Sequence, residues 1–366
     1  MTLRIPPIPR LARTLHAWAG AALSLLVIVI ASSGALLVWK DDFLRLTIPE
    51  ARVRFEPTPE ALARIAEGAE AAFGADSVAT VFFATEDLGL SEVTLIDESM
   101  AYLDVEGRVV DRWEIGGRPE DWLFDLHHRL VMGRTGLFIA GFAGLAVAAL
   151  AVAGLVAWWP MRRSIRLGPW PRGTGRAELL LGHRNIGAIA AVPIVIAALC
   201  GAGLAFPDTT LSTFLLRVRH DVSYGENFVD GIDTQSGAGV AGWGPALARA
   251  QAVFPGATIR SASYPAASPP YRVIRLQQRG AWSRQGDSIV YVDAFEGYMD
   301  IRIDARTLPP EEQLFNTLHP VHTAGLGNIV YKLYVFAIGV ALTALGVFGL
   351  WAFARRLRPG PRGDAA

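Results

Sequence analysis

Four long apolar runs alternate with polar segments along the chain. They cover approximately 17–39, 137–159, 186–206 and 329–353. Each provides the roughly 20 residues that a helix needs to cross a bilayer, and a helix satisfies its own backbone hydrogen bonds in lipid. The pattern predicts an integral membrane, α-helical protein with four transmembrane helices.

Arginine clusters flank these runs on one side only. Because positive charge collects on the cytoplasmic side of membrane helices, we expect both termini in the cytoplasm and the two long polar segments outside it. The clusters are Arg4, Arg10 and Arg13; Arg162, Arg163, Arg166, Arg172, Arg176 and Arg184; and Arg355, Arg356, Arg358 and Arg362.

The first apolar run has an alternative interpretation as a cleaved signal peptide. Its apolar stretch is longer than the usual hydrophobic region of such a peptide, and Lys40-Asp41-Asp42 is a poor cleavage site. We therefore expect an uncleaved membrane anchor.

The two polar segments, roughly 41–126 and 208–318, resemble each other. Each contains an amphipathic helical stretch, at 59–73 and 245–254, followed by alternating strand-like runs. Each segment is therefore predicted to form a small α+β unit, with one helix against an antiparallel sheet.

A shared hairpin motif supports this likeness. The first segment contains Tyr102-x-Asp104-x-x-Gly107, and the second contains Tyr291-x-Asp293 with Gly297 one residue later than the match requires. A strand, an Asp/Gly turn and another strand are typical of a β-hairpin.

An internal duplication is the strongest signal in the sequence. With an offset of 167 residues the first apolar run matches the third, and with an offset of 195 the second matches the fourth. The chain thus consists of two parallel copies of helix, polar segment and helix. The matches are His16 with His183, Gly20 with Gly187, Gly34 with Gly201, Ala35 with Ala202, Leu37 with Leu204, Asp41 with Asp208, His127 with His322, Gly144 with Gly339, Gly154 with Gly349 and Leu155 with Leu350.

This pattern gives the following expected organisation. Residues 1–40 form the cytoplasmic N-terminus and first span, 41–126 the first outer domain, 127–160 the second span and 161–182 a basic cytoplasmic loop. Residues 183–207 form the third span, 208–318 the second outer domain, 319–354 the fourth span and 355–366 a cytoplasmic tail.

Charge and cysteine content remove several function classes. The formal net charge is zero, so nothing indicates a nucleic-acid partner. A single cysteine, Cys200, excludes an intrachain disulfide, an iron–sulfur cluster and a cysteine-based zinc site. The seven histidines are the remaining candidates for redox or metal ligands.

Four histidines occupy repeat-matched positions at two membrane levels. His16 and His183 begin the first and third spans, while His127 and His322 precede the second and fourth. Two imidazoles from two helices at one level can ligate one haem iron. The sequence therefore predicts two b-type haems, His16 and His183 holding the inner one and His127 and His322 the outer one.

Two glycines support the inner pair. Gly20 and Gly187 lie four residues after His16 and His183, on the same helical face. A glycine there removes the side chain that would collide with a porphyrin edge.

Several alternatives remain open at this stage. A single histidine at a helix end is usually an interfacial residue, and a non-haem metal site would need more ligands nearby. His128 and His319 are possible alternative outer ligands or substrate-side groups, and His220 is expected on the surface. Arg13, Arg184, Arg129 and Lys332 are candidates to pair with haem propionates, or are flanking charges of the spans.

Several short strings resemble the PepSY-associated transmembrane family across nearly the whole chain. Ala324 is one departure, because the family often has a glycine there. The matching strings are Leu15-His16-x-x-x-Gly20, Leu126-His127, Gly154-x-x-x-Trp158-Trp159-Pro160, His183-Arg184-x-x-Gly187, Leu318-His319-Pro320-Val321-His322-Thr323 and the two Tyr-x-Asp hairpins.

The resemblance implies a multi-pass protein of the bacterial inner membrane with two periplasmic domains. Members of the family include reductases for ferric siderophores that carry two b haems, so a ferric siderophore or another ferric chelate is the expected substrate. No Gly-rich dinucleotide motif occurs in the chain, and the electron donor is expected to be a quinol or a separate reductase.

Two rival functions accompany this hypothesis. One is a haem-free, membrane-anchored binding module that modulates peptidases. The other is a cytochrome b subunit that serves a separate periplasmic reductase.

Overall fold

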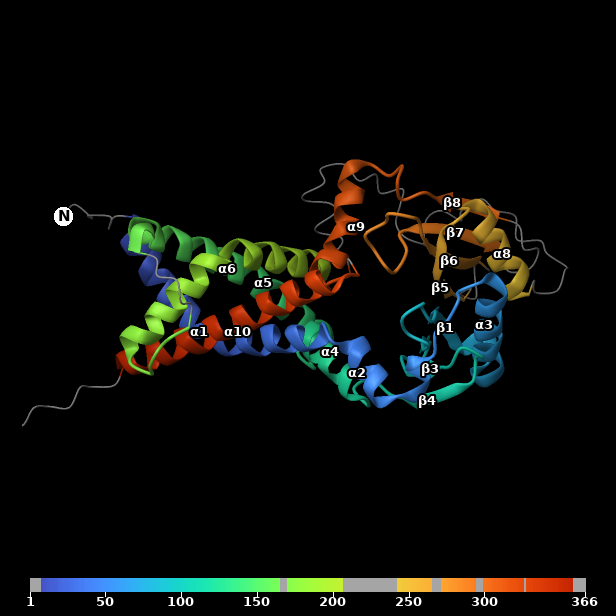
Figure 1. Cartoon of the computed structure of the whole chain (residues 1–366), viewed down its shortest axis with the longest axis horizontal. Coiled ribbons are helices and arrows are strands. Elements are labelled where there is room, and N and C mark those ends of the chain that lie inside the picture. Colours follow the sequence, from blue (N-terminus) through green and yellow to red (C-terminus); the bar gives the residue numbers. More distant parts are fainter. Residues whose placement is uncertain are drawn as a thin grey trace, which may run out of the picture.

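A helical bundle and a β-sheet region form the two ends of an elongated molecule (Figure 1). The computed structural model describes residues 8–164, 170–206, 242–264, 271–293, 299–325 and 327–357. His220 and Gly297, which the sequence interpretation used, lie outside these ranges.

Four long apolar helices make the bundle and confirm the four predicted spans. The chain is therefore a helical membrane protein with an attached α+β region. We call the end of the bundle next to the sheet the sheet end and the opposite end the arginine end. The helices are α1 (Ile8–Leu37), α5 (Gly133–Trp158), α6 (Arg176–Ala205) and α10 (Ile329–Leu357).

Small residues allow close packing of α10 on α1 and, in an equivalent way, of α5 on α6. A Cβ on Gly339 of α10 would lie 2.8 Å from the Cβ of Ala35 on α1. A Cβ on Gly144 of α5 would lie 2.9 Å from the carbonyl oxygen of Ala198 on α6. Close approach at small residues is a common basis of helix association in lipid, and here it follows the internal duplication.

The strands of both polar segments join into one eight-stranded antiparallel sheet. The sequence predicted two separate α+β units, but their first strands, β1 and β5, pair with each other. Because β1 and β5 pair with each other, neither strand is an open edge of the sheet. An open edge could pair with another chain and promote aggregation. The order is β4-β3-β2-β1-β5-β6-β7-β8, with β1 Val78–Phe82, β2 Ser91–Leu95, β3 Met100–Leu103, β4 Val109–Trp113, β5 Thr258–Ser263, β6 Tyr271–Gln277, β7 Ser288–Asp293 and β8 Met299–Ile303.

The predicted hairpin at Tyr102 is confirmed. Strands β3 and β4 are joined by a turn in which the Asp104 carboxylate accepts the backbone N–H groups of Glu106 and Arg108. Gly107 has a positive φ of 79°, a conformation that glycine adopts without strain.

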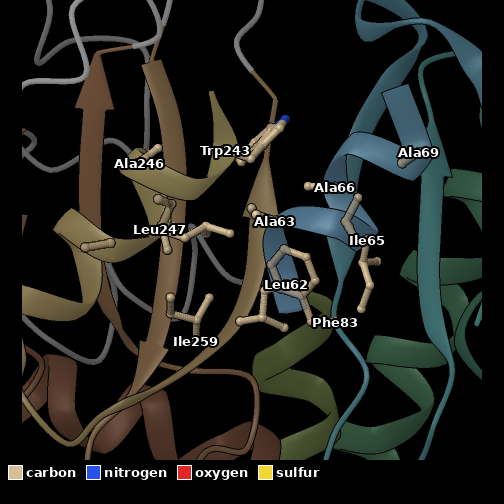
Figure 2. Close-up of a cluster of buried hydrophobic side chains, with 14 of the residues drawn as sticks. Leu62, Ala63, Ile65, Ala66, Ala69, Phe83, Trp243, Ala246, Leu247 and Ile259 are labelled. Atoms are coloured by element: carbon tan, nitrogen blue, oxygen red, sulfur yellow. The ribbon is translucent and has the colours of Figure 1, made fainter. Parts of the chain in front are cut away.

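One hydrophobic core serves both halves of the sheet. Helices α3 (Pro59–Phe73) and α8 (Trp243–Val253) lie side by side, and both contribute buried side chains to it (Figure 2). The indole Nε1 of Trp243 donates a hydrogen bond of 2.7 Å to Glu70 of α3, and Arg272 lies over the same indole. The two repeats therefore fold as one region.

Short helices connect the sheet to the bundle. Helices α2 (Lys40–Thr47), α4 (Pro119–Arg129) and α9 (Pro310–His322) lie between them (Figure 1). The histidines expected just before the second and fourth spans are therefore on α4 and α9, separated by turns from α5 and α10. Three short 3₁₀ segments complete the described elements: η1 Pro49–Arg52, η2 Ala75–Ser77 and η3 Trp159–Ser164.

The hydrogen bond between the two halves can be tested with two tryptophans. Trp243→Phe should lower the free energy of unfolding by about 1–3 kcal/mol, because the half-buried carboxylate of Glu70 loses its donor. Trp113→Phe is the matched control, since Trp113 is also buried but its Nε1 has no hydrogen-bond partner among the described residues. Pulse proteolysis of the full chain in detergent measures both, and equal losses would contradict a role for the bond.

Candidate functional site

Two pairs of histidine rings face each other inside the bundle. At the arginine end, the ring centres of His16 and His183 are 5.8 Å apart with planes at 75°. At the sheet end, the ring centres of His127 and His322 are 6.0 Å apart with planes at 29°. Each pair joins equivalent positions of the two repeats, which matches the pairing expected from the duplication.

At the arginine end, each ring is held by a carbonyl of a neighbouring helix. His16 Nδ1 lies 2.9 Å from the carbonyl oxygen of Leu150 on α5. His183 Nδ1 lies 3.0 Å from the carbonyl oxygen of Leu345 on α10. Leu150 and Leu345 are themselves related by the offset of 195 residues, so the duplication extends to the acceptors.

The same arrangement recurs at the sheet end. His127 Nδ1 lies 2.8 Å from the carbonyl oxygen of Ile30 on α1, and His322 Nδ1 lies 2.9 Å from that of Ala197 on α6. Ile30 and Ala197 are related by the offset of 167 residues. All four acceptors therefore occupy equivalent places in the two repeats.

These contacts determine which nitrogen is available for a ligand. A carbonyl oxygen only accepts hydrogen bonds, so Nδ1 must carry the proton and donate it. The other nitrogen, Nε2, then keeps its lone pair in the neutral ring. Metal-binding histidines are commonly oriented by this kind of bond.

Four residues after each carbonyl acceptor, on the same helix, stands a glycine next to the histidine ring. We call the acceptor carbonyl and this glycine together a histidine seat. A Cβ added to that glycine would press on the Cε1 atom of the ring. The separations are 2.6 Å for Gly34 and His127, 2.8 Å for Gly201 and His322, 3.1 Å for Gly154 and His16, and 3.3 Å for Gly349 and His183.

An apolar cavity of about 390 Å³ opens beside the arginine-end pair. All four long helices line it, and its wall includes His16 and His183. The volume falls within the range of small-molecule and cofactor sites. Trp158 also belongs to this wall, and its indole Nε1 is buried without a hydrogen-bond partner in the described part of the chain.

Gly20 and Gly187 leave free space in the same cavity. A Cβ on Gly20 would have no protein atom within 4 Å, and one on Gly187 would meet only Leu345 at 3.7 Å. Contacts within the protein therefore do not explain the glycine at position 20. A flat group bound in the cavity would explain it, because that group could occupy the space where a side chain would otherwise stand.

Arginines line the cavity together with the apolar side chains. Arg13, Arg176, Arg184 and Arg356 belong to its wall. Of the residues considered for propionates, Arg13 and Arg184 are therefore suitably located. Arg129 is not among the lining residues of this cavity.

Lys332 has a different role. It forms an ion pair with Asp42 of α2 and lies over the ring of Trp39. Burial alone would raise the pKa of Asp42, but hydrogen bonds from Lys332 and Arg45 outweigh it and hold that pKa below its usual value. The pair links the start of α10 to the segment after α1.

A buried polar cluster attaches α4, and with it His127, to the sheet. Glu120 in the first turn of α4 is 4% exposed. It accepts hydrogen bonds from the Tyr102 hydroxyl of β3 and from Arg118. Burial raises the pKa of Tyr102, so this hydroxyl stays protonated as a donor. The Tyr102 motif thus supports the site as well as the hairpin.

A tight left-handed turn then joins α4 to α5. Leu130 and Val131 have φ values of 53° and 56°. Gly136 must be glycine, because a Cβ there would lie 1.5 Å from the carbonyl oxygen of Arg129.

The connection from α9 to α10 is also left-handed. Ala324, where the resembling family often has glycine, has a φ of 62°, which explains the family's preference. The Tyr331 hydroxyl of α10 donates to the carbonyl oxygen of Val321 at 2.7 Å and fixes the end of α9.

The structure does not bring His128 and His319 into the facing pair. The ring of His128 packs on Phe124, and its Nδ1 is buried with no hydrogen-bond partner in the ranges that the structure describes. Within the described ranges, no group of three or more His, Cys, Asp or Glu side chains is arranged to hold a metal ion. The donor set therefore consists of two pairs of imidazoles.

The comparison with protein families agrees with this architecture. The PepSY-associated TM region family matches residues 13–356. The chain belongs to this family. Among curated proteins, none is similar enough to count as a relative. The match to the PepSY-associated family includes both histidine pairs, the sheet and all four long helices except the first residues of α1 and the last residue of α10.

Sequence reasoning missed the histidine seats. Gly34, Gly154, Gly201 and Gly349 were visible as repeat-matched glycines in the PepSY-associated chain, but their partners were not. The signal available in the sequence was the repeat matching itself, of Gly34 with Gly201 and of Gly154 with Gly349. It did not show which histidine each glycine contacts, because each of these glycines lies on a different helix from its histidine. The carbonyl acceptors have no sequence signal, because every residue has a carbonyl.

Two glycine substitutions test the seats. Alanine normally stabilises a helix interior by up to about 1 kcal/mol relative to glycine. Gly34→Ala should instead destabilise the protein by about 1–3 kcal/mol, because its methyl group overpacks the His127 ring. Gly20→Ala, which meets open space, is the control and should be neutral or stabilising in protein without a bound ligand. Thermal unfolding in detergent gives both values, and a stabilising Gly34→Ala would rule out the seat.

Proposed function

We propose that the chain binds two b-type haems and carries electrons across the bacterial inner membrane to a ferric chelate on the periplasmic side. The observation that carries this proposal is the presence of two facing imidazole pairs at two levels of one bundle. A b-type haem, when bound, supplies one-electron chemistry through its iron.

The spacing of the rings fits an iron between them. Two metal–nitrogen bonds of about 2 Å, with roughly 1 Å from each nitrogen to its ring centre, require about 6 Å between centres. The observed values are 5.8 and 6.0 Å. The Nδ1 bonds to carbonyls leave both Nε2 atoms of a pair as ligands and increase their basicity.

The cavity fits the rest of the group at the arginine end. Its apolar wall suits a macrocycle, the open space at Gly20 suits the edge of one, and Arg13 and Arg184 suit its propionates. The arginine clusters support a cytoplasmic location for this end and a periplasmic location for the sheet.

The ferric substrate rests on the family resemblance. Hard oxygen chelators hold Fe(III) much more tightly than Fe(II), so one electron weakens the complex and releases iron. A ferric siderophore is the substrate that this chemistry favours. The donor on the cytoplasmic side is a quinol or a separate reductase.

The two rival functions make different demands on the histidines. A haem-free binding module has no need for four partly buried imidazoles with their Nδ1 atoms engaged alike. A cytochrome b subunit of a separate reductase would keep both haems but lack its own ferric reductase activity, so assays of the purified chain distinguish it.

Pyridine haemochrome analysis should find close to two b haems per chain. His16→Ala and His183→Ala should each remove the same haem, because each deletes one axial ligand of one pair. His127→Ala and His322→Ala should remove the other. Stoichiometry near zero in the parent protein would end the proposal.

Two further histidine variants serve as controls for this series. His128→Ala and His319→Ala remove histidines close to the sheet-end pair that are outside it, so both haems should remain. Loss of a haem in His128→Ala with retention in His127→Ala would reassign the ligand.

The two ferric haems should differ in electron paramagnetic resonance. Nearly parallel imidazole planes separate the two iron d orbitals that interact with them, whereas nearly perpendicular planes leave these orbitals close in energy. The His127 and His322 pair, at 29°, should give a rhombic signal, and the His16 and His183 pair, at 75°, a strongly anisotropic one. Spectra of His16→Ala should lose only the anisotropic signal, and loss of the rhombic one would reverse the assignment.

A further inference from the structure

The layer between the two histidine pairs is aliphatic. Val27, Val147 and Ile194 form its buried centre. Side chains of all four long helices surround them: Leu23, Ala151, Ala190, Ala198, Ile338, Leu342 and Leu345. The cavity at the arginine end reaches this layer.

No ionisable Asp, Glu, Lys, Arg or His lies between the two levels. These residue types are absent from 17–33 of α1, 185–197 of α6, 135–154 of α5 and 333–349 of α10. Proton relays through membrane proteins depend on such groups. Between the two levels, the described helices therefore provide no Asp, Glu, Lys, Arg or His side chain by which a proton could accompany an electron.

The hydroxyl groups in this region do not form a relay either. Ser24 donates to the carbonyl oxygen of Gly20, Ser33 to that of Val29 and Thr343 to that of Gly339, each within its own helix. Ser33 Oγ also lies 3.4 Å from His127 Nδ1, so this contact ends at the sheet-end pair itself and does not extend toward the other level. These bonds satisfy the hydroxyls locally.

The two levels are far enough apart to span most of the hydrocarbon. Residue 16, which begins one level, and residue 30, whose carbonyl holds His127 at the other, are 14 positions apart on α1. At about 1.5 Å per residue this is about 21 Å, or roughly two-thirds of a core of about 30 Å. Residues 183 and 197 of α6 repeat the same spacing.

From this layer we propose that electron transfer between the two levels is electrogenic: each electron crosses most of the membrane without a proton, and the inside-negative membrane potential drives reduction on the sheet side. This inference rests on the proposed function. It adds that the membrane potential is a driving force for the reaction, and that sustained turnover needs a separate path for compensating charge.

The size of the effect follows from the distance. Moving one charge through two-thirds of a 100 mV potential changes its equilibrium distribution on the order of tenfold. An inside-negative potential favours the electron at the sheet end. An inside-positive potential, which the reaction itself generates, opposes it.

Sealed liposomes that contain the full-length haem-loaded protein provide the test. Dithionite trapped inside supplies electrons and is oxidised to sulfite, while each electron reduces one Fe(III) of external ferric EDTA to Fe(II). Only molecules with the arginine end inside receive electrons in the proposed direction. External Fe(II) formation should stop early with no ionophore and continue when valinomycin and equal potassium on both sides remove the potential. A voltage-sensitive oxonol dye should report an inside-positive potential during the reaction without valinomycin and none with it.

An imposed potential gives the sign. A potassium gradient that makes the interior negative should speed external reduction, and the opposite gradient should slow it. Equal rates with and without valinomycin in tight liposomes would overturn the electrogenic inference, because a proton would then be moving with the electron.

The failure of the proposed function gives a different result. His16→Ala liposomes provide the baseline without an arginine-end haem. If the parent protein has no haem and matches this baseline, the proposed function fails. If it has two haems and reduces external iron at a rate that valinomycin does not change, only the electrogenic inference fails.

Discussion

Four hydrogen bonds from histidine Nδ1 atoms to helix carbonyls determine the geometry of this protein's interior. Each bond crosses between helices, so the bundle positions the rings and the rings in turn connect the bundle. The acceptor must be reachable, which requires glycine four residues later: at Gly34 a side chain would stand 2.6 Å from the ring. Because Nδ1 is the donor in every case, the four Nε2 atoms are left for one common purpose. Identical contacts at repeat-related positions are hard to explain by helix packing alone.

The sheet depends on the same duplication and supplies the other half of the arrangement. Joining β1 to β5 makes one rigid region from two repeats, and that region holds α4 through Glu120 and Tyr102. His127 therefore has two fixed points, the sheet behind α4 and the Ile30 carbonyl on α1. His16 and His183 lie within the long helices and need no such support. This difference explains why the sheet-end histidines are on short separate helices that begin near the sheet.

The sequence was sufficient for the four spans, the duplication and the pairing of histidines by level, because apolar length and repeat offsets are local or periodic signals. It was also sufficient for the hairpin at Tyr102 and for the amphipathic helix at 59–73. It was not sufficient for the joined sheet, since edge pairing between β1 and β5 brings together residues far apart in the chain. Nor could it show that Lys332 pairs with Asp42, because charge alone did not distinguish a propionate from a carboxylate. The repeat offset already favoured His127 over His128, and the structure places His127 opposite His322 while His128 packs on Phe124.

Duplication alone would give two equivalent sites, yet the two ends differ in ways that bear on direction. The arginine-end pair adjoins a cavity whose wall includes four arginines, while the sheet-end pair adjoins the short helices below the sheet. The ring planes are nearly perpendicular at one end and closer to parallel at the other. In the electron carrier that we propose, positive charge near the arginine-end site would stabilise an added electron there, so the chain's own charges would hold an electron back at that end. Net outward transfer in such a carrier would then have to come from an acceptor beyond the sheet end or from a potential across the aliphatic layer, where Asp, Glu, Lys, Arg and His side chains are absent from the described helices.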